Sequence, residues 1–440
     1  MRRLNILNLL LSFILIFPLT SDYTSLLNAQ IQPDSLLLKE IFKIWAIDNH
    51  SHVFPFNQEI VNQSEPKDAL GTVPFPYPVR LRVDNPEYIK AWHSLYNYSY
   101  SDMDSAHTKD ALHNKYLLMR EKREDWPVWI LDQVRIQTAF VNLPKLGPGQ
   151  QNNRFRWVPL ADVLMIPFRV SNDTVSLKKG IMQILTELKM DSLPEKLTNY
   201  TSQVVTTILE RWKEEGAIAI KIAVAYQRTL NFSDVKETEV EDVYTALLRN
   251  EMVSASKYKA LQDYLFRYLA FESSRIGFAV HIHTGIGADP YFDVSGSNPM
   301  LLEPVLNDPI MRQTTFVLIH GGWPFEKQGG ILTIKPNVYI DFSAQTFLRS
   351  TRALSETLRE WLEWYPEKVL FGTDAYSDPN TPLSDWEEKI WLSNYSSRTA
   401  LAVALSGMMK DDEITEERAL EIARLVLREN AIRLYKLDGN

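Results

Sequence analysis

A short apolar run followed by a longer segment with helical periodicity recurs along this chain of 440 residues. The eight runs are rich in Ile, Val and Ala, and most are separated by enough residues for a helix. They span 44–48, 136–142, 158–166, 217–225, 277–283, 316–320, 338–342 and 368–374. Nearly continuous apolar strands that alternate with helices indicate a parallel sheet covered on its outer face. Eight such units predict an α/β fold, a closed (β/α)8 TIM barrel with its active site at the carboxyl ends of the strands.

The remaining segments predict how the chain is organised around this barrel. Arg2 and Arg3 precede a short apolar run that leads to the small residue Ala29, and this pattern is typical of a secretory signal peptide over residues 1–29. A buried helix and an uncleaved membrane anchor remain alternatives. The signal peptide predicts an exported protein, periplasmic or secreted. We expect the barrel to occupy residues 36–440, with a helical insertion after the first strand over about 55–124, and a closing helix over 414–430, capped by Thr415 and packed on the outside.

Charge and composition exclude several classes of function. The formal net charge of −8 gives no electrostatic reason to expect nucleic acid binding. The chain has no cysteine, which excludes disulfides, thiolate metal sites and a cysteine nucleophile. No Gly-x-Ser-x-Gly elbow is present, which disfavours a serine hydrolase. The expected partner is therefore a small-molecule substrate, with no membrane contact beyond the signal segment. The oligomeric state stays open, a homo-oligomer included.

Histidines gather at the ends of the predicted strands. His50 and His52 stand two residues apart, a spacing that in an extended chain points both imidazoles to one face. His283 ends the fifth run, His320 the sixth, and Asp374 follows the eighth. Because barrel strands end at one common face, these side chains are expected to surround a cation such as Zn²⁺. His281 lies deeper on the fifth run and is interpreted as a core residue or a neighbour of the site.

Strand parity places a lysine in the same region. In the fourth run, Lys221 shares one face with alanines, whereas isoleucines and a valine occupy the other face. The small-residue face suits the crowded barrel interior, where a lysine needs a partner. Lys221 could be a carboxylated bridge between two metals, or a cation opposite Asp374 or a substrate carboxylate. It could equally be paired with a buried acid and have no other role.

The set of motifs resembles the amidohydrolase superfamily, in particular the amidohydrolase 2 group and the FluG-type domain. The matching motifs, in chain order, are Ile-Asp48-Asn-His-Ser-His52, Lys221-x5-Gln-Arg228, His283-Thr-Gly-Ile-Gly287, Leu-Ile-His320-Gly-Gly-Trp-Pro324, Leu-Phe-Gly-Thr-Asp374-Ala and Asn430-Ala-Ile-Arg-Leu-Tyr435. The resemblance runs from about Ile44 to Leu437. It implies a metal-dependent TIM-barrel enzyme that holds one or two divalent ions.

The resemblance also implies roles for individual residues. His50, His52 and His283 would be metal ligands, and Asp374 would contact the metal and accept a proton from the attacking water. His320 would bind a second metal or polarise the substrate, and Lys221 stands where some members carry a carboxylated lysine.

From the residues themselves we expect hydrolysis of an amide, ester or lactone in a small carboxylated substrate. Arg228 and Tyr226 are candidates to bind that substrate carboxylate, and His281 is a further substrate-binding candidate. A decarboxylase or hydratase, a metal-dependent dipeptidase and an inactive secreted binding protein are the alternatives.

Overall fold

The computed structural model describes residues 32–62, 65–73, 77–168 and 175–437. The predicted signal peptide over 1–29 lies outside these residues. Pro33–Asn440 form one compact unit. Within the described part of the chain, no helix combines the length and the apolar character that crossing a bilayer would require.

Parallel strands in two sheets correspond to the predicted barrel. One sheet contains β1 (Ala46–Ser51), β2 (Ile136–Val141) and β3 (Phe155–Trp157). The other contains β4 (Ala219–Ile222), β5 (Ala279–His283), β6 (Phe316–Ile319), β7 (Val338–Asp341) and β8 (Val369–Leu370). Single parallel bridges link the two sheets at both seams: Trp157 with Ala217 and Leu160 with Lys221, and His52 with Tyr376. The order β1 to β8 is that of a (β/α)8 barrel.

The third strand differs from its prediction. The sequence predicts a strand over 158–166, but β3 spans Phe155–Trp157, and Asp162–Met165 form the short helix α7. The amide of Lys221 donates to Pro159 O, and the amide of Ala161 donates to Lys221 O, so the segment stays paired beyond β3. Because proline has no amide hydrogen, a regular ladder cannot continue through residue 159.

Within β4 and β5 the two faces divide as parity predicts, whereas beyond the ends of β4 the alternation is lost, since Ala217 and Ala225 join the outer cluster. Ala219 and Ala279 belong to a small apolar cluster inside the barrel, with Ile47, Phe140, Val317 and Leu370. Ile220 and Ile222 belong instead to the large cluster between the strands and the surrounding helices. The small side chains leave room in the interior for the ionisable groups that share their face.

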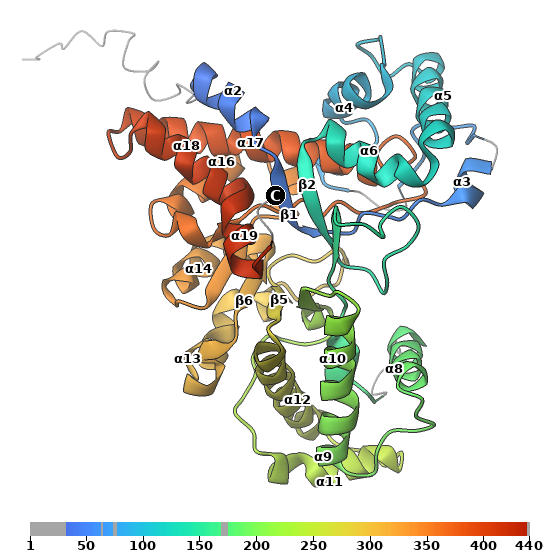
Figure 1. The fold of residues 1–440 in the computed structure, drawn as a ribbon, viewed down its shortest axis with the longest axis vertical. Coiled ribbons are helices and arrows are strands. Elements are labelled where there is room, and N and C mark those ends of the chain that lie inside the picture. Colours follow the sequence, from blue (N-terminus) through green and yellow to red (C-terminus); the bar gives the residue numbers. More distant parts are fainter. Residues whose placement is uncertain (1–31, 63–64, 74–76, 169–174, 438–440) are drawn as a thin grey trace, which may run out of the picture. The chain divides into compact units, whose positions relative to one another are not determined.

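Helices cover the outside of the strands (Figure 1). After β1 come α3 (Gln58–Asn62), α4 (Glu87–Tyr96), α5 (Ser105–Lys122) and α6 (Trp126–Gln133), and α2 (Ser35–Lys43) precedes that strand. Between β3 and β6 lie α7, α8 (Val175–Glu187), α9 (Leu197–Asn199), α10 (Thr207–Glu214), α11 (Glu237–Leu248), α12 (Ala255–Ile276) and α13 (Glu303–Asn307). The later helices are α14 (Glu326–Ile331), α15 (Gln345–Leu348), α16 (Thr351–Leu362), α17 (Trp386–Lys410), α18 (Glu416–Arg424) and α19 (Asn430–Tyr435).

The segment after β1 is fastened to α17 by a buried ionic cluster. Lys115 on α5 is 3% exposed, and its ammonium lies 3.0 Å from carboxylate oxygens of both Glu387 and Glu388. Trp126 Nε1 donates to Glu387 and Tyr96 Oη donates to Glu388. These bonds satisfy the buried charges, which would otherwise be costly.

The C-terminal helix begins as predicted but ends elsewhere. Thr415 caps α18, since its hydroxyl accepts from Arg418 N at 3.2 Å. A π-helical turn, η11 (Leu425–Glu429), then carries the chain into α19. Beyond the predicted segment the chain turns inward. Ala431 joins the interior apolar cluster, and Tyr435 reaches polar groups of the barrel floor.

Candidate active site

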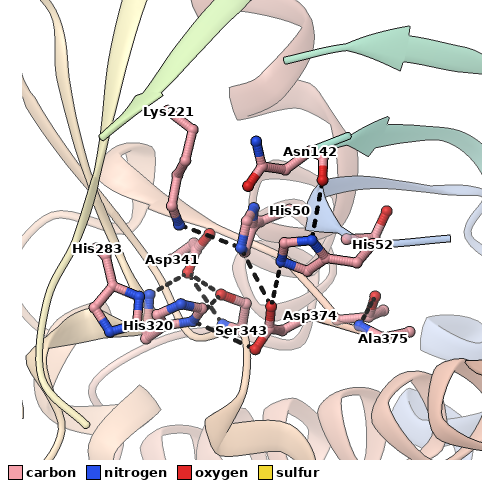
Figure 2. Close-up of polar contacts among 12 residues, drawn as sticks. His50, His52, Asn142, Lys221, His283, His320, Asp341, Ser343, Asp374 and Ala375 are labelled. Atoms are coloured by element: carbon pink, nitrogen blue, oxygen red, sulfur yellow. Dashed lines mark hydrogen bonds and ion pairs between the residues drawn. The ribbon is translucent and has the colours of Figure 1, made fainter. Parts of the chain in front are cut away.

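The polar residues at the strand ends meet around one cavity (Figure 2). The cavity has a volume of about 560 Å³. Its lining includes His50, His52, Lys221, His283, His320 and Asp374, which come from β1, β4, β5 and the segments directly after β1, β6 and β8. Residues separated by up to 324 positions along the chain (374 minus 50) thus share one pocket, as the barrel geometry predicts.

The tightest cluster of donor atoms contains His50, His52 and Asp374. Asp374 Oδ1 lies 3.2 Å from His50 Nε2 and 3.3 Å from His52 Nε2. Ligand atoms of the three residues all lie within 4.8 Å of one another, a spacing that could hold one metal ion. Two imidazoles and a carboxylate suit Zn²⁺ or a similar divalent ion.

Hydrogen bonds assign the protons of His52. Its Nδ1 lies 3.0 Å from the backbone oxygen of Asn142, which can only accept, so Nδ1 carries the hydrogen. The lone pair of Nε2 consequently faces the oxygen of Asp374 that is 3.3 Å away. Two acceptors at this separation repel each other unless a proton or a metal ion lies between them. The donor set therefore fits a metal ion.

His283 and His320 line the cavity outside this cluster. Their ring centroids are 4.6 Å apart, and His320 Nδ1 lies 3.9 Å from Asp374 Oδ2. His283 Nε2 donates to Ile286 O at 3.1 Å, which leaves its Nδ1 with the lone pair. Both imidazoles are thus neutral groups at the margin of the three-residue cluster.

Ser343 and Asp341 fix the orientation of His320. The Ser343 hydroxyl donates to Asp341 Oδ1 at 2.7 Å and lies 2.9 Å from His320 Nδ1. Because the hydroxyl hydrogen is already used, Ser343 accepts from Nδ1–H, and the lone pair of His320 lies on Nε2. Asp341 also accepts from the backbone amide of His320 at 2.8 Å. Both carboxylate oxygens of this buried acid accept hydrogen bonds, since Asn49 Nδ2 donates to Oδ2 at 3.0 Å.

Lys221 extends from β4 to the edge of the same cluster (Figure 2). Its ammonium lies 3.3 Å from His50 Nε2, and the residue is 2% exposed. Burial lowers the pKa of Lys221 to about 8, against the opposing attraction of Asp374. Lys221 is the single lysine or arginine among the described residues that line the cavity.

Burial and charge set the protonation of the cluster in the form that a metal requires. Burial lowers the pKa of His50 to about 3 and holds the pKa of His283 and His320 well below the usual range. Burial alone would raise the pKa of Asp374, but the neighbouring His320 and His50 outweigh it and hold that pKa well below its usual value. Neutral imidazoles beside an ionised carboxylate are the forms that bind metal ions.

The backbone is strained at two of these positions. His320 has a φ of 68° and Asp374 a φ of 57°, both in the left-handed region that non-glycine residues seldom adopt. The amide of Asp374 donates to His50 O at 2.8 Å, and Asp48 accepts from the amide of Thr373 at 2.9 Å. These bonds hold the turn after β8 against β1. Strain of about 1–3 kcal/mol per residue is characteristic of functional sites.

His281 lies in the barrel floor below the cavity. It is completely buried, its Nε2 lies 2.7 Å from Tyr435 Oη, and its Nδ1 has no hydrogen-bond partner among the described residues. Tyr435 in turn donates to Asn49 Oδ1 at 2.6 Å. His281 does not line the cavity. The structure therefore agrees with its interpretation as a core histidine and does not bring it to a substrate.

The two residues expected to bind a substrate carboxylate are placed differently. Tyr226 lines the cavity, with its ring centroid 4.8 Å from that of His283. Arg228 does not line it, because its guanidinium is bound to Asp263 on α12 at 2.6 Å and also contacts Gln262. The prediction that Arg228 binds substrate is not supported, since a buried acid already neutralises it.

The remaining histidines lie in the segment after β1. His107 is bonded to Asp102 at 2.7 Å and stacks on Tyr100, and His113 is paired with Glu65 at 3.0 Å. Asp102, Asp104 and His107 form a second group of potential metal ligands, but both carboxylates are exposed. These histidines stand apart from the cavity lining.

Sequence reasoning missed the groups that orient the site. Ser343, Asn142 and Asn49 direct His320, His52 and Tyr435 through the bonds described above. Serine and asparagine after a strand are common in turns, so their spacing alone carries no signal. Asn49 and Tyr435 do lie within two of the motifs that resemble the amidohydrolase superfamily, and this was the one signal in the sequence that pointed to them.

Comparisons with known proteins relate the chain to one family. Residues 203–437 match the family model Amidohydro_2, described as amidohydrolase. The chain is 27% identical over 237 residues to protein fluG of Emericella nidulans, a match that covers 51% of this chain and 26% of that protein. The matched part is thus about a quarter of the length of this relative.

Solved structures share the fold at low sequence identity. The uronate isomerase of Thermotoga maritima has a TM-score of 0.65 at 13% identity, covering 91% of this chain and 96% of its own. The glucuronate isomerase of Caulobacter crescentus has a TM-score of 0.62 at 14% identity, covering 92% and 94%. A Lactobacillus casei protein designated a metal-dependent hydrolase has a TM-score of 0.59 at 16% identity, covering 92% and 98%.

Proposed function

The chain belongs to the amidohydrolase family of metal-dependent enzymes, and on that premise we propose that it hydrolyses an amide, ester or lactone bond in a small carboxylated substrate. The observation that carries the proposal is the cluster of His50, His52 and Asp374, whose lone pairs converge within 4.8 Å. We propose Zn²⁺ as the ion, held by these three residues.

The neighbouring histidines suit the same ion. His320 presents an Nε2 lone pair, because its Nδ1–H is directed to Ser343 at 2.9 Å. It therefore acts as an acceptor or a ligand and cannot donate a hydrogen bond to a substrate carbonyl through Nε2. His283 has its lone pair on Nδ1. A divalent cation bound here supplies Lewis-acid chemistry, polarising a carbonyl and lowering the pKa of a water molecule to roughly 7.

Asp374 is the proposed general base. One carboxylate oxygen faces His50 and His52, and the other lies 3.9 Å from His320 Nδ1. The carboxylate takes a proton from the attacking water as the oxygen of that water bonds to the acyl carbon. It then gives the proton to the nitrogen or oxygen that leaves, so the products are an acid and an amine or alcohol.

Lys221 is proposed to bind the substrate carboxylate. Its ammonium faces the cavity, and the other candidate, Arg228, is bound to Asp263. A role as a carboxylated bridge would instead require two metal ions per chain. Metal stoichiometry distinguishes the two roles.

The test combines metal analysis with a hydrolysis screen of N-acyl and γ-glutamyl compounds. We expect one zinc ion per chain and release of a free amine. Asp374→Asn at saturating zinc should reduce kcat at least about 100-fold, whereas Asp289→Asn in an exposed loop should not. Release of CO₂, or isomerisation of a sugar acid without hydrolysis, would overturn the proposal.

We further propose that the chain is exported after removal of residues 1–29 and acts on a small molecule. The basic and apolar start of the sequence supports export. Expression of the full chain in bacteria should yield a mature protein that begins near Gln30, as read by N-terminal sequencing. Recovery of an intact N-terminus in the cytoplasm would refute export.

A further inference from the structure

The lining of the cavity is of two chemical kinds. Besides the ionisable side chains it includes Phe54, Leu81, Leu143, Phe347, Leu348 and Tyr376, called here the apolar wall. Leu81 and Phe347 are 7% and 2% exposed, so they present packed surfaces. A substrate bound in this cavity can therefore bury an apolar group against this wall.

No charged partner is available at the wall. Among the described residues that line the cavity, Lys221 and Asp374 alone carry a formal charge, and neither belongs to the wall. The nearby guanidinium groups are engaged elsewhere: Arg80 with Glu87 at 2.7 Å, and Arg349 with Gln345 at 2.7 Å. The aliphatic and phenylalanine side chains of the wall offer no hydrogen-bond partner to the hydroxyls of a sugar acid, and unpaired polar groups are costly to desolvate.

The wall is held in place by Arg80. This side chain belongs to the turn η1 (Val79–Leu81), and its guanidinium donates to Thr346 O at 2.8 Å and to Ser396 Oγ at 2.7 Å. It also donates to Arg349 O. Arg80 thereby joins the segment that carries Leu81 to α15, which carries Phe347 and Leu348.

Tyr376 is fixed in a similar way on the opposite side. The ammonium of Lys389 lies 4.2 Å from the centre of its ring, and the ring of Phe347 lies 6.0 Å away in an edge-to-face arrangement. Tyr376 also pairs with His52 through an isolated bridge. The wall is thus preorganised and begins directly beside a residue of the metal cluster, which lowers the entropic cost of binding a rigid group.

We propose that this wall is a subsite for an apolar, ring-sized acyl group of the substrate, on the side of the scissile bond away from Lys221. The substrate class is then an N-acyl or O-acyl compound with one carboxylate and a hydrophobic acyl moiety. This inference rests on the proposed function for its hydrolytic step.

The test compares N-benzoylglycine with N-acetylglycine on the zinc-loaded full chain. The benzoyl compound should have a kcat/KM at least about 10-fold higher, because the larger apolar group is buried against the wall. Leu81→Asn should remove most of this preference, measured as the ratio of the two kcat/KM values, whereas Ile310→Asn, an exposed position outside the cavity, should preserve it. Arg80→Met should lower the same ratio, because it raises the KM for the benzoyl compound.

A binding measurement separates this inference from the proposed function. Calorimetry on the Asp374→Asn chain should show tighter binding of N-benzoylglycine than of N-acetylglycine. This difference should shrink in the double variant that carries both Leu81→Asn and Asp374→Asn. If neither compound is hydrolysed but the binding difference persists, the proposed function fails and the subsite stands. Equal binding of the two compounds, or preference for the acetyl compound, would overturn the subsite. Circular dichroism melts check that each variant is folded.

Discussion

Replacement of Lys115 by methionine should destabilise the protein strongly. The substitution keeps the length of the side chain but removes the ammonium that lies 3.0 Å from Glu387 and from Glu388. Both carboxylates are at most 2% exposed, so they would remain buried without a counter-charge. Breaking a buried ion pair on one side costs about 3–5 kcal/mol, more than the net worth of the pair, because the orphaned charge stays desolvated.

The loss should depend on pH. Burial already raises the pKa of Glu387, although Lys115 opposes the rise, so removal of the lysine should raise it further. A carboxyl whose pKa is higher in the folded than in the unfolded protein binds its proton preferentially in the folded state. The stability that this protonation contributes is present at low pH and is lost as the pH rises through the folded pKa. The deficit of Lys115→Met should therefore be larger at pH 8 than at pH 5.5.

Urea unfolding of the zinc-loaded chain at both pH values measures the effect. The double variant that carries both Lys115→Met and Glu388→Gln should recover part of the lost free energy of unfolding, because one of the two buried charges is then removed. Lys122→Met at the exposed end of α5 is the matched control and should change the free energy of unfolding by less than about 0.5 kcal/mol. If Lys115→Met lowers the free energy of unfolding by less than about 1 kcal/mol, or by the same amount at the two pH values, then Lys115 does not neutralise the two buried carboxylates.

Two further substitutions test contacts of the C-terminal helices. Tyr435→Phe should lower the free energy of unfolding in urea by about 2–3 kcal/mol, because Asn49 Oδ1 and His281 Nε2 lose their buried partner. An unchanged free energy of unfolding would mean that water replaces the hydroxyl. Thr415→Ala should lower the free energy of unfolding by about 1 kcal/mol, since the amide of Arg418 loses its hydrogen-bond acceptor. Thr415→Ser should restore it. Equal stability of the alanine and serine variants would show that the hydroxyl does not cap the helix.

The parts of the fold that follow from residue periodicity were predictable. Alternation of Ala219 and Lys221 with Ile220 and Ile222 indicated which face of β4 lies inside the barrel, and the structure agrees. The spacing of His50 and His52 likewise predicted that both imidazoles face one partner, and they converge on Asp374. These features depend on local geometry, which a sequence displays directly.

Contacts between distant segments were not predictable in the same way. Arg228 follows β4 as the prediction required, but Asp263, 35 residues later on α12, binds its guanidinium. The end of β3 depends on where Pro159 interrupts the ladder with β4. Pro159 is visible in the sequence, but the strand that it pairs with is not, and no pattern marks Asp263 as the partner of Arg228, because such contacts are decided by packing.

The most direct test of the account is the zinc stoichiometry of the full chain and its dependence on His52. Equilibrium dialysis followed by elemental analysis should give one zinc ion per chain, and His52→Ala should weaken binding at least tenfold. His107→Ala serves as the control, because it alters the exposed group that also contains Asp102 and Asp104. This control should keep its zinc. Zinc that is lost in His107→Ala but retained in His52→Ala, or a wild-type chain that binds none, would show that His50, His52 and Asp374 do not form the metal site.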